Sequence, residues 1–172
     1  MITKKQTKKR ASKMSRRTLE LREQLWPKLD KDILWDRNTA KGFSTLPRTM
    51  PHILEILDDL AGKGTPVSKV YLSLWCRVFD EALLDIKSYK DLAFEAGFNG
   101  QRAVTMWKQR MALLVELGFI LAEKGAGGKY DYILLLNPYP IIKKCYEAGN
   151  VQKYKYIILF NRAQEIGATD LQ

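Results

Sequence analysis

Residues 88–120 read SYKDLAFEAGFNGQRAVTMWKQRMALLVELGFI, and this stretch predicts two helices on either side of a Gly-Phe-Asn-Gly corner. Ser88, followed three residues later by Asp91, is typical of the capping box that begins a helix. Gly97 is well placed to end that helix in the left-handed conformation, and Phe98 supplies the apolar contact that often follows. Asn99 would then cap the second helix. Two helices joined by a short segment containing glycine form a helix-turn-helix, so we predict one here.

The second helix is expected over residues 100–117. When successive residues are placed about 100° apart around the helix axis, it has an apolar side and a polar side. The apolar side holds Val104, Trp107, Met111, Leu114 and Val115. The opposite side holds Arg102, Thr105 and Gln109, flanked by Gln101, Met106 and Lys108. Side chains of the Arg, Lys, Gln and Thr types match base edges in the major groove of DNA. We therefore predict DNA contacts from Gln101, Arg102, Thr105, Lys108 and Gln109.

Two short apolar or aromatic runs follow, residues 119–124 and 129–135, about a Gly-Ala-Gly-Gly turn, and they predict a β-hairpin. The order helix, helix-turn-helix, ELGFI and glycine-tipped hairpin, over residues 67–137, resembles the winged-helix superfamily. The resemblance implies a DNA-binding domain whose wing is the hairpin, with Lys124 and Lys129 at its base contacting phosphate. Winged helices also serve as protein-docking or dimerisation modules without DNA readout, and this alternative stays open.

The segment before this unit predicts a helix and a loop. An amphipathic helix is expected over residues 18–34, with an interruption near Pro27, where proline favours a new helical start. The Gly, Pro, Ser and Thr content of residues 35–51 predicts a loop. Trp35 and Phe43 are expected to pin this loop onto the core.

Two helices are expected between the loop and the helix-turn-helix. A proline-containing start signal at Thr49 predicts a helix over residues 52–61, in which Ile and Leu recur at helical spacing. Residues 67–84 are apolar on much of their circumference, which predicts a long buried helix. Trp75 and Phe79 are assigned to the core side of that helix.

Two further helices are expected after the hairpin, the first from Pro140 to Gly149 and the second from Val151 to about Ile166. The predicted fold class is therefore mainly α with a small β-hairpin wing: a winged helix-turn-helix with extra N- and C-terminal helices. The expected parts are a disordered basic arm (residues 1–17), a helix and loop packed on the core (18–51), the winged-helix DNA-binding domain (52–137) and a C-terminal helical extension (138–172).

Positive charge is concentrated at the amino terminus. The formal net charge is +10, and the first 17 residues hold eight Lys and Arg side chains and no Asp or Glu. A segment this polar cannot bury enough apolar area to offset its ordering entropy, so we expect it to be disordered alone. We predict that it binds a polyanion, with counterion release on contact. The arm residues assigned to DNA are Lys8, Lys9, Arg10, Arg16 and Arg17; a solubilising tail is the alternative.

Enzymatic chemistry is not expected from this sequence. His52 is the single histidine, and Cys76 and Cys145 lie far apart without CxxC spacing, so the sequence offers no zinc-binding set. Both cysteines are expected to be buried thiols of a reducing compartment. The sequence also lacks a phosphate loop, a nucleophile elbow and a catalytic carboxylate pair. We expect no cofactor, no metal and no small-molecule substrate.

The expected location is cytoplasmic, without a membrane partner. No apolar run approaches the roughly 18 residues of a membrane span, and the basic amino terminus is not followed by the apolar core of a signal peptide. The expected function is binding of double-stranded DNA, as a transcription regulator or as a replication or maintenance factor of a mobile element such as a plasmid. RNA binding is the alternative, because basic arms also fold on RNA. A homodimer would match the two half-sites that DNA operators commonly contain.

Overall fold

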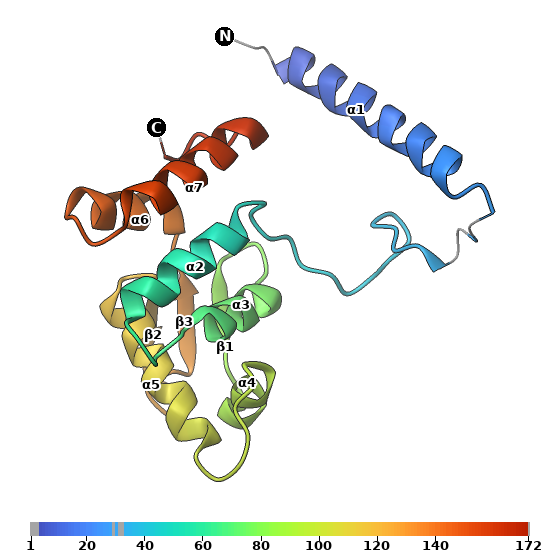
Figure 1. The fold of residues 1–172 in the computed structure, drawn as a ribbon. Coiled ribbons are helices and arrows are strands. Elements are labelled where there is room, and N and C mark those ends of the chain that lie inside the picture. Colours follow the sequence, from blue (N-terminus) through green and yellow to red (C-terminus); the bar gives the residue numbers. More distant parts are fainter. Residues whose placement is uncertain (1–3, 29, 31–32, 172) are drawn as a thin grey trace. The chain divides into compact units, whose positions relative to one another are not determined.

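The computed structural model describes residues 4–28, 30 and 33–171, with side chains from residue 15 onward. The chain divides into two compact units, Met1–Gly42 and Phe43–Gln172. The second unit is mainly helical and contains a small three-stranded antiparallel sheet (Figure 1). The coarse prediction of a mainly α fold with a little β structure is therefore confirmed.

The first unit contains one long helix, α1 (Lys4–Leu25), where a disordered arm is predicted over residues 1–17. The segment is rich in strong helix formers and holds no Gly or Pro before Pro27. Arg16 Nε also lies 3.1 Å from Glu20 Oε1, one helical turn away, a spacing that supports a helix. High charge therefore argues against a buried core in this segment and does not argue against a helix.

Helix α1 ends just before Pro27, where proline removes a backbone donor and disfavours the α conformation of the preceding residue. The predicted continuation to residue 34 is wrong, since no α-helix follows in the described part of residues 26–42. Trp35 and Phe43 are also exposed, at 69% and 42%. Every buried hydrophobic side chain among the described residues lies at or after Met50, so these two aromatic residues do not anchor the loop in the core.

Helix α2 (Met50–Ala61) begins two residues before the predicted start at residue 52, with Thr49, the predicted start signal, as its N-cap residue and a proline in its first turn. Ile53, Ile56 and Leu57 are buried at helical spacing and form one wall of the core. Thr49 is itself buried, and its hydroxyl lies 2.5 Å from the Tyr139 hydroxyl, which ties the start of α2 to a helix near the C-terminus.

Helix α3 (Ser68–Arg77) is shorter than the predicted helix over residues 67–84. An extended Val78 ends it, and strand β1 (Leu83–Asp85) follows. Along residues 83–86 buried and exposed positions alternate, which is the period of a strand and not of a helix. The assignment of Phe79 to the core is wrong as well, because this side chain is 85% exposed, whereas Trp75 is partly buried.

Helix α4 (Tyr89–Glu95) begins and ends as predicted. The Ser88 hydroxyl accepts a hydrogen bond from the Asp91 amide at 3.2 Å, and Gly97 has the left-handed φ of 85° that ends the helix. The Phe98 amide donates to the Ala93 carbonyl at 2.9 Å, and the Phe98 ring packs against the core. The Ser88 cap, the Gly97 stop and the Phe98 contact are thus present in the structure.

Helix α5 (Ala103–Glu116) begins later than predicted, and Asn99 does not cap it. Gly100 has a left-handed φ of 78°, and the Ala103 amide donates to the Gly100 carbonyl at 3.2 Å. These features make residues 100–102 a separate turn. Arg102 therefore occupies the N-cap position of α5 instead of its first turn.

Strands β2 (Ile120–Glu123) and β3 (Tyr132–Leu135) form the predicted hairpin. The sheet has the order β1-β3-β2, so β1 pairs with β3, with Leu84 opposite Ile133. The side chains of Leu84 and Ile133 are buried, so the face of the sheet that carries them lies against the core. The strand β1 is absent from the sequence-based prediction.

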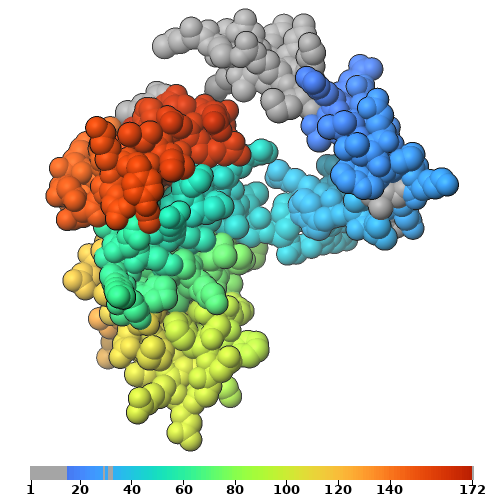
Figure 2. All heavy atoms as spheres, in the orientation of Figure 1, coloured from blue at the N-terminus to red at the C-terminus, as the bar shows by residue number. Residues whose placement is uncertain are grey.

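The C-terminal helices α6 (Pro138–Glu147) and α7 (Lys153–Ile166) confirm the predicted helical extension. The Asn137 side chain caps α6 by accepting from the Tyr139 amide at 3.1 Å, so this helix begins before Pro140. Helix α7 packs against α2 (Figure 2). Lys155 Nζ of α7 lies 2.6 Å from Asp59 Oδ2 of α2 and is also paired with Glu55.

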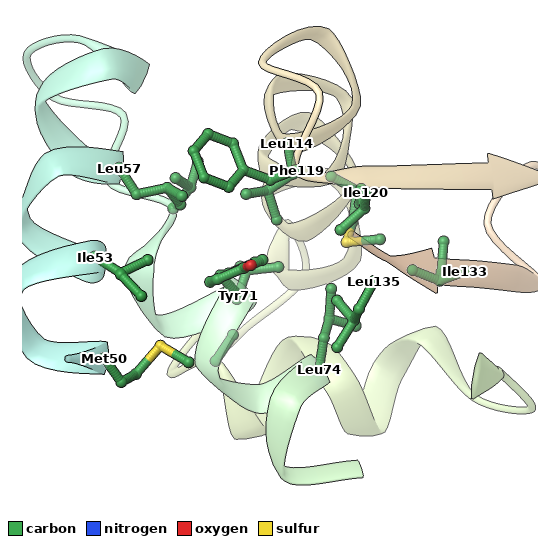
Figure 3. Close-up of a cluster of buried hydrophobic side chains, with 14 of the residues drawn as sticks. Met50, Ile53, Leu57, Tyr71, Leu74, Leu114, Phe119, Ile120, Ile133 and Leu135 are labelled. Carbon is green, nitrogen blue, oxygen red and sulfur yellow. The ribbon is translucent and has the colours of Figure 1, made fainter. Parts of the chain in front are cut away.

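The core of the second unit lies between the helices and the inner face of the sheet. Figure 3 shows side chains of α2, α3, α5 and the sheet converging on Tyr71 and Phe119. The two rings meet edge to face, with centroids 5.8 Å apart, an arrangement that favours aromatic pairs. Burial raises the pKa of Tyr71 to about 12.

Candidate nucleic-acid interface

The polar side chains predicted to contact DNA from α5 and the turn before it are all exposed. They are Gln101, Arg102, Thr105, Lys108 and Gln109. On the opposite side of the helix Trp107, Met111 and Leu114 are completely buried. The division of α5 into an apolar and a polar side is therefore confirmed.

Trp107 packs α5 against α4 and the hairpin. Its ring stacks on Tyr89 of α4, with centroids 5.3 Å apart and planes at 26°. It also meets Tyr130 of the hairpin edge to face, at 5.9 Å. These three rings, which we call the aromatic cluster, connect α4, α5 and the β2–β3 hairpin through one buried side chain.

The hairpin is attached to α4 by hydrogen bonds between Tyr89 and Asp131. The Tyr89 hydroxyl donates to Asp131 Oδ1 at 2.5 Å and accepts from the Tyr130 amide at 3.1 Å. Asp131 Oδ2 accepts from the amides of Gly127, at 2.6 Å, and Gly128, at 3.1 Å. We call this arrangement the Tyr89–Asp131 clasp. It provides acceptors for two backbone donors of the hairpin turn, the Gly127 and Gly128 amides.

The glycines of the turn are needed for the clasp to close. A Cβ atom on Gly125 would lie 2.5 Å from Asp131 Oδ2, and a Cβ atom on Gly128 would lie 2.8 Å from the Tyr89 hydroxyl. Both distances are shorter than van der Waals contact allows. The Gly-Ala-Gly-Gly turn is therefore a close approach of backbone to side chains, in addition to a tight reversal of the chain.

The clasp also sets the charge state of its two side chains. The hydrogen bond from Tyr89 lowers the pKa of Asp131, and the Gly127 and Gly128 amides lower it further, although burial opposes them. Burial, followed by the hydrogen bond to Asp131, raises the pKa of Tyr89. At neutral pH the clasp therefore holds an ionised carboxylate and a neutral phenol.

Two cations lie on the aromatic cluster, one from α5 and one from the hairpin. Lys108 Nζ is 4.8 Å from the centre of the Tyr89 ring, and Lys129 Nζ is 5.4 Å from the centre of the Tyr130 ring. Both rings contact Trp107. Lys108 and Lys129, which belong to separate predicted contacts, therefore lie on two rings that share Trp107, while Lys124 is exposed where the hairpin turn leaves β2.

The other basic residues have different surroundings. Arg110 is on α5 but is buried, and it donates to the Pro66 carbonyl at 3.0 Å, which identifies it as a structural residue. Arg16 and Arg17 are exposed on α1, and Arg16 pairs with Glu20. Of the predicted arm contacts, the side chains of Lys8, Lys9 and Arg10 lie outside the described residues.

The sequence-based prediction did not include Tyr89 or Asp131, although both shape this surface. The available signal was the pair of glycines at 127 and 128 followed by a carboxylate three residues later, since short acidic side chains commonly accept from turn amides. The partner on α4 gave no such signal, because Tyr89 is 42 residues from Asp131 in sequence.

The described residues show three further features. Cys76 is exposed instead of buried, and Cys145 is half-buried; both are free thiols. No group of three or more His, Cys, Asp or Glu side chains that could hold a metal ion is found in the described part of the chain. No helix among the described residues is long and apolar enough to cross a membrane.

The comparisons with known proteins find no match: no family model, no curated protein and no solved structure is similar to this chain.

Proposed function

We propose that the chain binds double-stranded DNA as a winged-helix protein, with α5 as the base-reading helix and the β2–β3 hairpin as the wing. The order helix, helix-turn-helix and hairpin supports this proposal, since α3 is followed in the chain by α4, α5, β2 and β3, with the short strand β1 between α3 and α4. Strand β1 adds a third strand beside the hairpin without changing that order.

The observation that carries the proposal is the meeting of α5 and the hairpin at the aromatic cluster. Lys108 and Lys129 lie on two rings that share Trp107, so cations from the helix and from the wing are held by one rigid support. An α-helix is about 10 to 12 Å wide, and the major groove of B-DNA is about 12 Å wide. The helix would read bases while the wing contacts phosphate.

The start of α5 has the side chains that base reading requires. Gln101 and Arg102 precede the first turn, and Thr105 and Gln109 follow on the exposed side. Recognition helices contact bases mainly through residues near their amino-terminal end. Arg102, at the N-cap position, is exposed.

The basic helix α1 would add phosphate contacts. Its Arg16 and Arg17 are exposed, and the segment through residue 17 contains eight of the cations of a chain with a net charge of +10. A cation near DNA releases condensed counterions, which increases affinity for any sequence. The proposal covers a transcription regulator and a replication or maintenance factor of a mobile element such as a plasmid, acting as a homodimer if the operator is palindromic.

The proposal is tested by titrating labelled DNA duplexes with the full-length protein at a series of salt concentrations. We expect the logarithm of affinity to fall linearly with the logarithm of salt concentration, by about 0.9 for each phosphate contacted. Duplex DNA should compete better than RNA of the same sequence. Tighter binding to RNA would favour the RNA alternative, and no binding at low salt would favour the docking-module alternative.

A further inference from the structure

A groove lies at the end of the sheet away from the hairpin turn. The turn connects Glu123 to Tyr132, whereas the groove is lined by Leu135 at the other end of β3. Its volume is about 610 Å³, and its walls come from the end of α3, the loop over residues 78–82, the start of α6 and the segment over residues 43–47. This groove is therefore a separate surface from the candidate nucleic-acid interface.

Phe79 is the dominant side chain of the groove. At 85% exposed it is the most exposed of the large hydrophobic side chains in the described part of the chain. Trp75, from the end of α3, lines the groove beside it. An exposed aromatic residue next to a concave apolar surface is the usual composition of a protein-docking site.

The loop that carries Phe79 has a fixed backbone. Ala82 has a φ of 58°, a left-handed conformation that residues other than glycine rarely adopt. Its amide donates to the Phe79 carbonyl at 3.2 Å, and its carbonyl accepts from the Leu135 amide at 2.9 Å. Because both bonds hold the loop, the exposure of Phe79 is a property of the fold and not of a frayed segment.

The charge of the groove is opposite to that of the chain. Among the described residues, its lining includes the carboxylates of Asp80 and Asp170 and no Lys or Arg, in a chain whose net charge is +10. The Asn137 side chain donates to Asp170 Oδ2 at 3.1 Å and so holds this carboxylate at the groove. Such a surface repels the phosphates of nucleic acid and attracts a cationic ligand.

We propose that this groove docks a short segment of a second protein that carries an aromatic or large aliphatic side chain next to Lys or Arg. The apolar side chain would pack on Phe79 and Trp75, and the cation would pair with Asp80 and Asp170. This proposal goes beyond DNA binding and does not depend on it. The groove and the hairpin turn lie at opposite ends of β3.

The test begins with selection of peptides from a random library on the immobilised full-length protein. We expect enriched peptides to share an aromatic or aliphatic residue adjacent to Lys or Arg. One enriched peptide is then labelled with a fluorophore, and its affinity for the protein is measured by fluorescence anisotropy. Phe79→Ala should weaken its binding at least about tenfold, because truncation of a central aromatic residue commonly has an effect of this size. A double variant, Asp80→Asn with Asp170→Asn, should weaken binding and reduce its dependence on salt.

Phe94→Ala is the matched control, since Phe94 is 71% exposed on α4 and does not line the groove. It should bind the peptide like the parent protein. Enrichment of peptides without the apolar-basic pattern, no enrichment at all, or equal binding by Phe79→Ala would overturn the proposal. Sedimentation of the parent and of Phe79→Ala adds one more outcome: if the parent self-associates and this variant does not, the occupant is a second copy of the chain and the partner proposed here is wrong.

Discussion

The Tyr89 hydroxyl donates a hydrogen bond to Asp131 Oδ1 across 2.5 Å and thereby joins α4 to the β2–β3 hairpin. The same hydroxyl accepts from the Tyr130 amide, and the Asp131 carboxylate accepts from two glycine amides of the turn. The Tyr89 ring meanwhile stacks on Trp107 of α5. One tyrosine thus fixes the hairpin and the polar side of α5 relative to each other.

Removing this hydroxyl should loosen the hairpin without emptying the core. In Tyr89→Phe the ring can still stack on Trp107, but the Asp131 carboxylate and the Tyr130 amide lose a partner. We expect the free energy of unfolding to fall by about 1 to 2 kcal/mol, measured by urea denaturation. Tyr154→Phe is the control, because Tyr154 is 57% exposed. Equal stability of Tyr89→Phe and the parent protein would show that the clasp contributes nothing.

The charge of Asp131 predicts how the clasp depends on pH. The pKa of Asp131 is lowered in the folded protein, chiefly by the Tyr89 hydrogen bond. Its contribution to stability is therefore complete above its unfolded pKa of about 3.9 and is lost as pH falls through the still lower folded pKa. The difference in unfolding free energy between the parent and Asp131→Asn should be constant near neutral pH and shrink below about pH 4. Urea midpoints across this range would measure it, and a difference that grows as pH falls would contradict the assignment.

Trp107 should be the most sensitive position of α5. It is completely buried and contacts both Tyr89 and Tyr130, so Trp107→Ala removes the support shared by α4 and the hairpin. We expect a loss of about 3 to 5 kcal/mol, seen as a lower melting temperature. Thr105→Ala on the exposed side of the same helix should melt close to the parent protein. A small effect at Trp107 would mean that the buried face of α5 is misassigned.

Deletion of residues 1–17 should separate general attraction from base reading. These residues contain eight Lys and Arg side chains and no acidic residue, and they form most of α1. We expect the shortened protein to bind all duplexes more weakly by a similar factor and to show a smaller salt slope. Competition assays with selected and scrambled duplexes would measure both quantities. If the affinity at each salt concentration and the salt slope are both unchanged, the segment acts only as a solubilising tail.

Local signals made helices α4 and α5 predictable. Ser88 caps α4 through a neighbour only three residues away, and Gly97 ends the helix through its own backbone conformation. The apolar side of α5 follows from helical periodicity alone, and Trp107 is buried as this pattern predicts. The start of the second helix was harder to predict. Asn99 is a good capping residue, but Gly100 adopts a left-handed conformation and the helix begins only at Ala103.

The features that sequence reasoning missed depend on distant partners. Strand β1 is only three residues long and exists because Leu84 pairs with Ile133 across the sheet. Its Leu-Leu-Asp-Ile run is also compatible with the end of a buried helix, so periodicity alone favours the wrong structure. The wrong assignment of Phe79 to the core has the same origin, since Phe79 lies in the loop that separates α3 from β1 and is exposed.

The most direct test of the proposed DNA readout compares two exposed cations on two duplexes. Arg102 is the N-cap residue of α5, and Lys129 lies on the hairpin. Neither side chain is buried, so Arg102→Ala and Lys129→Ala should both melt like the parent protein. Affinity is measured at one fixed salt concentration for a duplex selected from a random pool and for a scrambled duplex of equal length.

If α5 reads bases, Arg102→Ala should cost about 1 to 3 kcal/mol on the selected duplex, have little effect on the scrambled one and relax the preference at one base position. Lys129→Ala should weaken both duplexes by a similar, smaller factor, because a phosphate contact carries no sequence information. Equal loss on both duplexes in Arg102→Ala, or no loss on either, would contradict base reading by α5.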